Sequence, residues 1–311
     1  MKRTIIQYTT VVLAVLAGMI FVTYMTRMGN RDMTGDMAQA QLPVVYAEQD
    51  GVLYNEMHGY VEDMDGASMR DSVIGVSEDH KVGLALEKYN AQIKSVSYEV
   101  RSLDMSRLIE GGDDLQAEDD GKYLHVSLTL KDLLTQGEEY LLVLKVQTED
   151  QDLVRFYSIL TYLGTNHVQD CVDFAQRFHE MTLTGDSDGV LNYLEQDGSM
   201  DGKNLGYINI HSRSGPVTWG DMQVVETGET SLRFTELESD ITALTMEYQV
   251  TNTETSEQYQ VREAYRLRYT STRIYLLAYE RWTDKILEPG RQLVEDGKLS
   301  FGIQSREPVY M

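Results

Sequence analysis

Residues 167–194 read HVQDCVDFAQRFHEMTLTGDSDGVLNYL, and they mark a change in the hydrophobic period of the chain. In this stretch apolar side chains recur every three or four residues, which predicts a helix that buries one face. Gly185 is a suitable end for that helix, and Asp186 or Ser187 can cap a short second helix. The apolar positions of the first helix are Val168, Cys171, Val172, Ala175, Phe178 and Met181.

Upstream of this helix, residues 42–165 predict an all-β sandwich domain of the immunoglobulin-like (Ig-like) kind. Short runs rich in β-branched and aromatic residues are separated by turn clusters such as Gln49-Asp50-Gly51, and several alternate apolar with polar positions. The runs are LPVVYAEQ (42–49), VLYNEMHGYV (52–61), KVGLALEK (81–88), IKSVSYEVRSL (93–103), YLHVSLTL (123–130), EYLLVLKVQT (139–148) and LVRFYSILTYL (153–163).

Downstream, residues 166–288 predict an α+β domain, because the two helices are followed by a series of strand candidates. These are YINIHS (207–212), VTWGDMQVVE (217–226), SLRFTEL (231–237), ITALTMEYQV (241–250), QYQVREAYRLRY (258–269) and RIYLLAYERW (273–282). The motif GDSDGVLNYL at 185–194 and the long strands after it resemble the NTF2-like (cystatin-like) fold. That resemblance implies a curved sheet wrapped around helices.

A second resemblance covers more of the chain. Five segments resemble uncharacterised membrane-anchored extracytoplasmic proteins of clostridial gut bacteria: YVEDMD (60–65), SYEVRSLD (97–104), INIHS (208–212), VTWGD (217–221) and RIYLLAYER (273–281). The resemblance implies further β repeats after these elements but no activity. We therefore expect the C-terminal extension, residues 289–311, to include the start of such a repeat.

The N-terminal region predicts a membrane anchor. Residues 4–26 carry no charged side chain, and a helix of this length spans roughly 34 Å, enough for a hydrocarbon core of ~30 Å. We expect residues 1–27 to form a cytoplasmic stub and transmembrane anchor, residues 28–41 a linker, and the remaining domains to lie outside the cell membrane. The alternative is a cleavable signal peptide ending near Ala38-Gln39-Ala40.

Charge and cysteine content narrow the function classes. The net charge is −23, and residues 32–311 alone carry −27, so we expect no nucleic-acid partner. The single Cys171 can neither form an internal disulfide nor hold a metal by itself.

The sequence contains no motif that requires catalysis. His179-Glu180 begins like a zinc-protease signature, but Leu183 stands where the second histidine ligand belongs. Calcium-loop, nucleophile-elbow and phosphate-loop patterns are incomplete or absent. We therefore predict no catalytic residues, no metal and no cofactor.

The candidate ligand surface lies on the last long strands. Tyrosines there fit either a pocket or ordinary sheet packing, and evenly spaced arginines fit either an anionic-ligand site or cross-strand pairs with glutamates. The candidate residues are Trp219, Tyr259, Tyr265, Arg262, Arg266, Arg268 and Tyr275.

These observations favour a non-enzymatic, membrane-tethered binding or scaffold module of the bacterial cell envelope. Its partner would be an envelope protein or a cell-wall glycan. Two alternatives stay open at this stage: an ectodomain that regulates or senses for a membrane-bound signalling partner, and an enzyme that uses an NTF2-like pocket.

Overall fold

The computed structural model describes residues 15–23, 42–69, 72–113, 115–149, 153–165, 167–197, 205–286, 294–295 and 298–299. Residues 15–23 are helical and exposed, and the rest of the predicted 4–26 span lies outside the described residues, as do the predicted linker and most of the C-terminal extension. Among the described helices none has both the length and the apolar character needed to cross a bilayer.

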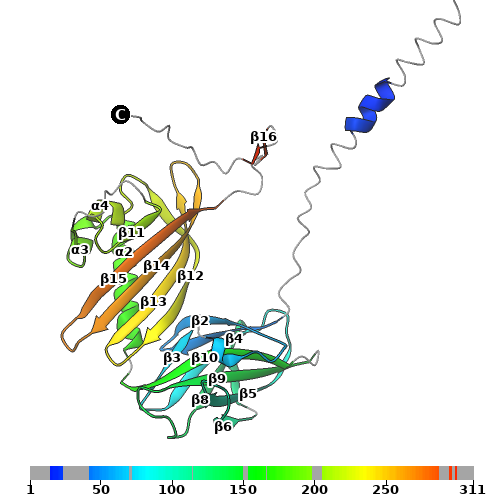
Figure 1. Ribbon diagram of the computed structural model, residues 1–311, viewed down its shortest axis with the longest axis vertical. Coiled ribbons are helices and arrows are strands. Elements are labelled where there is room, and N and C mark those ends of the chain that lie inside the picture. The colour runs from blue at the N-terminus through cyan, green and yellow to red at the C-terminus, as the bar shows by residue number, and fades with distance from the viewer. Residues whose placement is uncertain are drawn as a thin grey trace, which may run out of the picture. The chain divides into compact units, whose positions relative to one another are not determined.

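Two five-stranded sheets pack face to face over residues 44–164, which confirms the predicted β-sandwich (Figure 1). The first sheet has the order β2-β1-β4-β8-β7 and the second the order β3-β10-β9-β5-β6. The first sheet consists of β1 (Val44–Gln49), β2 (Val52–His58), β4 (Lys81–Glu87), β7 (Ala117–Asp119) and β8 (Tyr123–Thr129). The second consists of β3 (Val73–Ser77), β5 (Ile93–Ser102), β6 (Leu108–Gly112), β9 (Glu139–Thr148) and β10 (Leu153–Gly164), and a short 3₁₀ helix spans Gly66–Ser68.

The alternation in the sequence produces the sandwich core. Along β5, for example, Val96, Tyr98 and Val100 are buried while the residues between them are partly exposed, as expected for a strand with one face on the core. The strands β3, β6 and β7 were not predicted, because they are short and lack a long alternating run.

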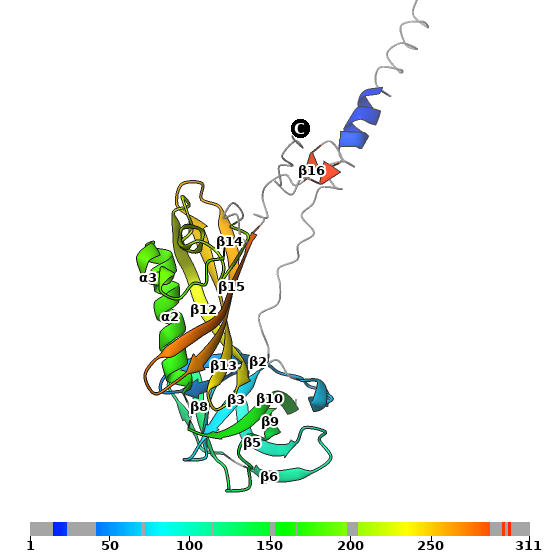
Figure 2. The same ribbon diagram turned by 60° about the vertical axis from the view of Figure 1, so that its left-hand side comes forward.

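The third sheet is antiparallel and has the order β11-β15-β14-β13-β12. Its strands are β11 (Tyr207–Asn209), β12 (Val224–Leu237), β13 (Ile241–Asn252), β14 (Gln258–Tyr269) and β15 (Ile274–Lys285). Helix α2 (Val168–Thr184) lies along one face of this sheet (Figure 2). The short helices α3 (Ser187–Leu191) and α4 (Ser214–Val217) follow α2, and β16 (Val294–Glu295) pairs with β17 (Lys298–Leu299) near the C-terminus.

Helix α2 begins and ends where its sequence predicts. Its apolar face is buried from Val168 to Phe178, and Gly185 ends it in the left-handed conformation at φ 77°, a geometry that glycine adopts without steric cost. Asp186 then caps α3, because its carboxylate accepts a hydrogen bond from the Gly189 N–H at 2.9 Å. The helix therefore presents a fixed face to the sheet.

One strand prediction was wrong. The run 217–226 is not extended from its start, because Val217 ends α4 and β12 begins only at Val224. Trp219 and Gly220 have φ angles of 68° and 59°, and two consecutive left-handed residues turn the chain away from a strand. From Val224 on, β12 continues through two irregularities to Leu237, so the second predicted run belongs to the same strand.

The sandwich and the third sheet share one hydrophobic core. The ring of Phe234 on β12 lies edge-on to Tyr54 on β2, with the centroids 5.2 Å apart. Asn55, which is fully buried, donates to the Val73 carbonyl at 2.7 Å and accepts from the Phe234 N–H at 2.7 Å. These contacts join the two parts of residues 42–286 into one packed body.

Candidate functional site

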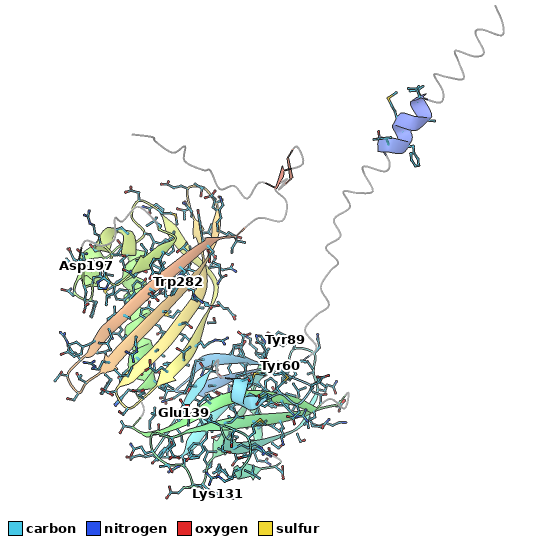
Figure 3. All side chains as sticks on the ribbon, in the orientation of Figure 1. Tyr60, Tyr89, Lys131, Glu139, Asp197 and Trp282 are labelled. Atoms are coloured by element: carbon cyan, nitrogen blue, oxygen red, sulfur yellow. The ribbon has the colours of Figure 1, made fainter. Side chains whose placement is uncertain are left out.

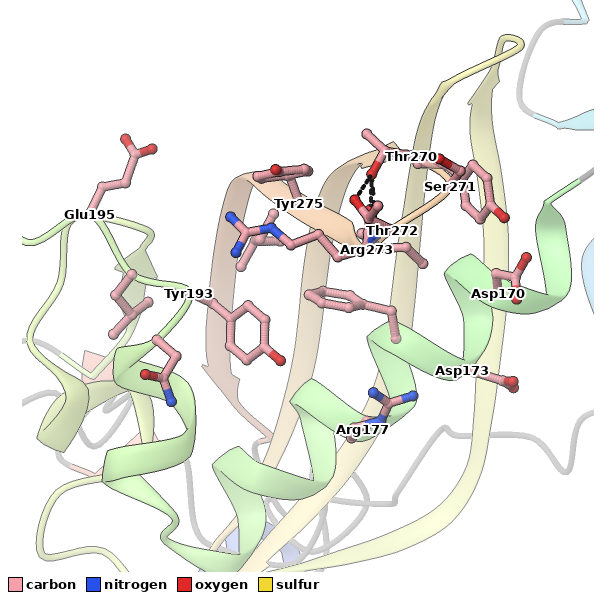
Figure 4. A pocket seen from close by; sticks show the side chains of 16 residues that line it. Asp170, Asp173, Arg177, Tyr193, Glu195, Thr270, Ser271, Thr272, Arg273 and Tyr275 are labelled. Carbon is pink, nitrogen blue, oxygen red and sulfur yellow. Dashed lines mark hydrogen bonds between the residues drawn. The ribbon is translucent and has the colours of Figure 1, made fainter.

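A groove of about 770 Å³ opens between α2, the turn after α3 and the hairpin that joins β14 to β15 (Figure 4). Helix α2 contributes Asp170, Asp173, Phe174 and Arg177; the turn contributes Asn192, Tyr193, Leu194 and Glu195; the hairpin contributes residues 269–276. Each wall comes from an element whose position is fixed by the core, so the groove is a built feature of the third sheet and its helix.

Aromatic side chains form the inner surface of the groove, and hydrogen bonds hold the hairpin. Phe174 and Tyr193 lie edge to face with centroids 5.3 Å apart. The Thr270 hydroxyl donates to the Arg273 carbonyl at 2.6 Å, and the Arg273 guanidinium lies 3.9 Å from the centre of the Tyr275 ring. The hairpin therefore presents a cation and an aromatic ring on a braced turn.

Two arginines give the groove its binding chemistry. Arg177 and Arg273 are both exposed, and Figure 4 shows them around the same hollow, with Tyr193 at the turn. The arginine ion pairs found in the part of the chain that the structure describes involve Arg101, Arg155 and Arg266 instead. Two guanidinium groups are thus available to a carboxylate or phosphate, in a chain whose net charge is −23.

Acidic side chains on the groove wall limit what this arginine pair can bind. Asp170, Asp173 and Glu195 are exposed and line the same hollow. A ligand with a dense run of negative charge would be repelled by them. A ligand with one or two anionic groups can place these at Arg177 and Arg273 while keeping neutral or cationic parts beside the aspartates.

A second polar cluster lies on the inner face of the sheet and is closed. The carboxylate of Glu263 is fully buried and accepts hydrogen bonds from the Tyr265 hydroxyl at 2.6 Å and the Tyr279 hydroxyl at 2.8 Å. His179 on α2 lies between two carboxylates, with Nδ1 3.1 Å from Glu263 and Nε2 3.4 Å from Glu226. The network joins α2 to three strands of the sheet.

The charges of this cluster stabilise each other. Burial alone would lower the pKa of His179, but its hydrogen bond to Glu263 and the charges of Glu263 and Glu226 raise it above the usual value. Burial alone would raise the pKa of Glu263, but the bonds from His179 and Tyr265 and the charge of Arg281 lower it. Both shifts favour a protonated His179 beside an ionised Glu263.

Arg281 completes the interior of this domain. It is fully buried and donates to the carbonyls of Val217 and Pro216 at 2.7 and 2.9 Å. Its guanidinium lies 3.9 Å from the Trp219 ring centre, a cation–π geometry. Arg281 thus fixes the end of α4 and Trp219 against the sheet, and it is not available to an external ligand.

The structure separates the predicted site residues into three places. Trp219 and Tyr265 are buried on the inner face. Tyr259 is partly buried, and burial together with Glu257 raises the pKa of its hydroxyl to about 12. Tyr275 is 38% exposed and lines the groove.

The three predicted arginines lie on the other, outer face of the third sheet and are exposed. Arg262 stacks over Trp282, which Figure 3 labels on this sheet, at 4.4 Å. Arg266 forms a two-bond ion pair with Glu236 at 2.9 and 3.0 Å, and Arg268 shares this face. The predicted aromatic and basic residues therefore do not converge on one pocket.

Several residues of the groove and of the buried cluster were missed by sequence reasoning. On α2, Asp170, Asp173 and Arg177 recur at the spacing of one exposed helix stripe, a signal that could have found them. Glu263 stands between Val261 and Tyr265 in a strand whose buried and exposed residues alternate. Its position in this alternation alone places its side chain on the buried face. No three metal-ligating side chains gather among the residues that the structure describes.

Comparisons with known proteins identify no family. No family model matches the chain, and no curated protein matches it. A crystal structure of an engineered protein aligns at 14% identity with a TM-score of 0.25, over 42% of this chain and 22% of that one. CopC from Methylosinus trichosporium OB3b aligns at 14% identity with a TM-score of 0.21, over 31% of this chain and 89% of CopC. Similarities this weak carry no argument about fold or function.

Proposed function

We propose that this chain is a non-enzymatic, membrane-tethered binding module of the bacterial cell envelope, and that the groove beside α2 is its ligand site. The observation that carries the proposal is the pair of exposed guanidinium groups, Arg177 and Arg273, in an otherwise acidic chain. The ligand is an anionic group of an envelope protein or a cell-wall glycan.

The proposal includes the placement of the domains. Residues 4–26 anchor the chain, and the Ig-like domain (42–165) and the NTF2-like domain (166–288) lie outside the cytoplasm. A helix that crosses one face of a five-stranded antiparallel sheet supports the NTF2-like assignment. The charge of −27 on residues 32–311 supports a site that depends on a local cationic feature.

An enzyme that uses the interior of the C-terminal domain is a less well-supported alternative. The acid and base groups there, Glu263 and His179, are buried and hydrogen-bonded to one another. A general acid or base must reach the proton of its substrate directly or through one water. The open groove instead presents arginines and aromatic rings, which are binding groups.

The test measures binding of two anionic probes to the full-length chain in non-ionic detergent. One probe is the fluorescein-labelled peptide SVEVES, blocked at both ends, and the other is a labelled glycerol-phosphate oligomer. An exposed ion pair is worth about 0.2–1 kcal/mol. R177Q/R273Q removes two such pairs, so it is expected to bind the probe that the unsubstituted chain binds about 2- to 30-fold more weakly. Fluorescence anisotropy at low and high salt gives the affinities.

The control is Arg266→Gln, which removes one positive charge from the outer face of the same sheet. It is expected to leave the affinity unchanged. Failure of both probes to bind, or an equal loss in R177Q/R273Q and Arg266→Gln, would show that the groove is not an anion-binding site.

A further inference from the structure

Strand β15 has an open edge along the groove. The strand runs from Ile274 to Lys285, and β14 pairs with it along its whole length. On its other side β11 pairs only with residues 280–282. Within the described residues, no strand pairs with residues 274–278 on that side, and Figure 1 shows β15 along this border of the sheet.

The strand position next to β15 is filled by β11 and Ile210, and after Ile210 the chain turns away from it. β11 runs antiparallel to β15, and the N–H of the next residue, Ile210, donates to the Tyr279 carbonyl at 2.9 Å. The chain then turns at His211, whose N–H donates to the Asn209 side chain, and forms α4. The Ile210 carbonyl accepts from the Glu195 N–H at 2.9 Å, so the turn after α3 borders this point. Beyond it no described strand fills the position opposite residues 274–278, and the groove lies beside Ile274, Tyr275 and Leu276.

The backbone of residues 274–278 is suited to pair with an added strand. An edge strand exposes the N–H and C=O groups of alternate residues, and charged residues, proline or a β-bulge usually protect it. Residues 274–278 read IYLLA and contain no charged residue and no proline. One bulge lies within them at Leu277, where the pairing with β14 shifts register. Ile274, Tyr275 and Leu276 also line the groove, so an added strand would lie inside it.

We infer that the groove binds an extended peptide segment of a partner protein, and that this segment adds to β15 as an antiparallel strand in line with β11. The inference rests on the proposed function and narrows its ligand to a peptide. An open sheet edge is completed by another peptide backbone, in the binding mode known as β-augmentation. The open stretch of about five residues, at ~3.3 Å each, accommodates a peptide of the same length.

The charges of the groove define the side chains of that peptide. Arg177 and Arg273 are exposed on opposite walls, one on the helix and one on the hairpin. They complement one or two carboxylates on the face of the peptide that turns toward α2. Asp170 and Asp173 exclude a continuous acidic run, so the recognised segment alternates acidic with neutral residues.

The experiment compares two N-methylated forms of the SVEVES peptide on the full-length chain. In a strand, the N–H groups of alternate residues face the same neighbour, so only one of two sets can bond to β15. One form carries N-methyl groups on both valines and the other on both glutamates. One form is expected to bind about tenfold or more weakly, and the other close to the unmodified peptide.

Amide hydrogen exchange locates the binding edge. Bound SVEVES is expected to slow exchange at the amides within residues 274–278 that face away from β14, whereas amides at 280–282, where β11 already pairs, should not change. The neutral peptide SVQVQS should bind more weakly, and Arg266→Gln should leave all of these results unchanged.

The outcomes separate this inference from the proposed function. Equal affinity of the two N-methylated forms, or unchanged exchange at 274–278, overturns strand addition even if binding depends on Arg177 and Arg273. Binding of the glycerol-phosphate probe alone also overturns it and leaves the anion-binding groove. If neither probe binds, both the inference and the proposed function are wrong.

Discussion

His179 is a buried base whose charge depends on its neighbours, and its contribution to stability should therefore depend on pH. Its pKa is raised in the folded chain, so its stabilising effect is fully present below the ordinary value of about 6.5 and is lost as pH rises through the folded-state value. The pKa of Glu263 is lowered, so its contribution is present above its ordinary value and is lost as pH falls through the folded-state value.

We predict that the free energy of unfolding decreases as pH rises above about 6.5, and that His179→Gln reduces this decrease. Part of the decrease remains in the variant, because hydrogen bonds to Glu48 and Asp120 also raise the pKa of His125. Breaking a buried ion pair costs about 3–5 kcal/mol, so His179→Gln should destabilise the chain by that amount near pH 5.5 and by less near pH 9. Urea unfolding of the full-length chain at several pH values measures both effects.

The control for this prediction is His58→Gln, because the His58 side chain is 68% exposed. This substitution should leave the dependence of the free energy of unfolding on pH the same as in the unsubstituted chain. A His179→Gln chain that keeps the same slope would show that another group carries the pH dependence.

At the scale of elements, β2 connects the sandwich to the third sheet through one irregularity. The pairing of β1 with β2 shifts register where Asn55 lies, and Asn55 adopts the left-handed conformation at φ 53°. This bulge directs the buried amide between β3 and β12. Asparagine tolerates that conformation better than other non-glycine residues and supplies both a donor and an acceptor.

We predict that Asn55→Ala destabilises the chain by about 2–4 kcal/mol, because it leaves two buried backbone groups unpaired and places a Cβ-bearing residue without a local hydrogen bond in the left-handed region. Urea denaturation measures the loss. Asp50→Ala is the matched control, since Asp50 is exposed at φ 49° and isolates the backbone cost of about 1–2 kcal/mol. Equal losses in the two variants would contradict the role of the amide.

Elements whose hydrophobic pattern repeats over many residues were predictable from the sequence. Elements whose conformation depends on tertiary contacts were not. The face of α2 and the alternation along β13 and β14 follow directly from residue spacing. The turn at Trp219 does not, because its left-handed backbone is stabilised by packing on Arg281, which is distant in sequence. For the same reason the short strands β3 and β7 are recognisable only beside β10 and β8.

At the scale of the whole molecule, the candidate site depends on contacts between distant elements, which residue spacing does not reveal. The even spacing of Arg262, Arg266 and Arg268 correctly predicted that they share one face of the sheet. The spacing does not say which face of the sheet helix α2 covers. The groove combines α2 with a hairpin almost 100 residues further along the chain. Only the pairing of distant elements brings Arg177 near Arg273, and only the departure of the chain after Ile210 opens the edge of β15.

The continuous core predicts that residues 42–286 unfold as one cooperative unit. Both tryptophans, Trp219 and Trp282, belong to the C-terminal part of this unit, so their fluorescence reports on the third sheet. Leu144 lies in the core of the sandwich and is 1% exposed. Because Phe234 packs on Tyr54 across the junction, loss of packing at Leu144 should reach the tryptophans through the shared core.

We predict that Leu144→Ala lowers the free energy of unfolding by about 2–5 kcal/mol, and that tryptophan fluorescence and far-ultraviolet circular dichroism of the full-length chain report the same shifted transition. Phe234→Ala, at the junction itself, should separate the two signals, because it removes the ring that couples the sheets. If tryptophan fluorescence of Leu144→Ala keeps the unsubstituted midpoint while circular dichroism shifts, the sandwich and the third sheet unfold independently, and the shared core does not couple them.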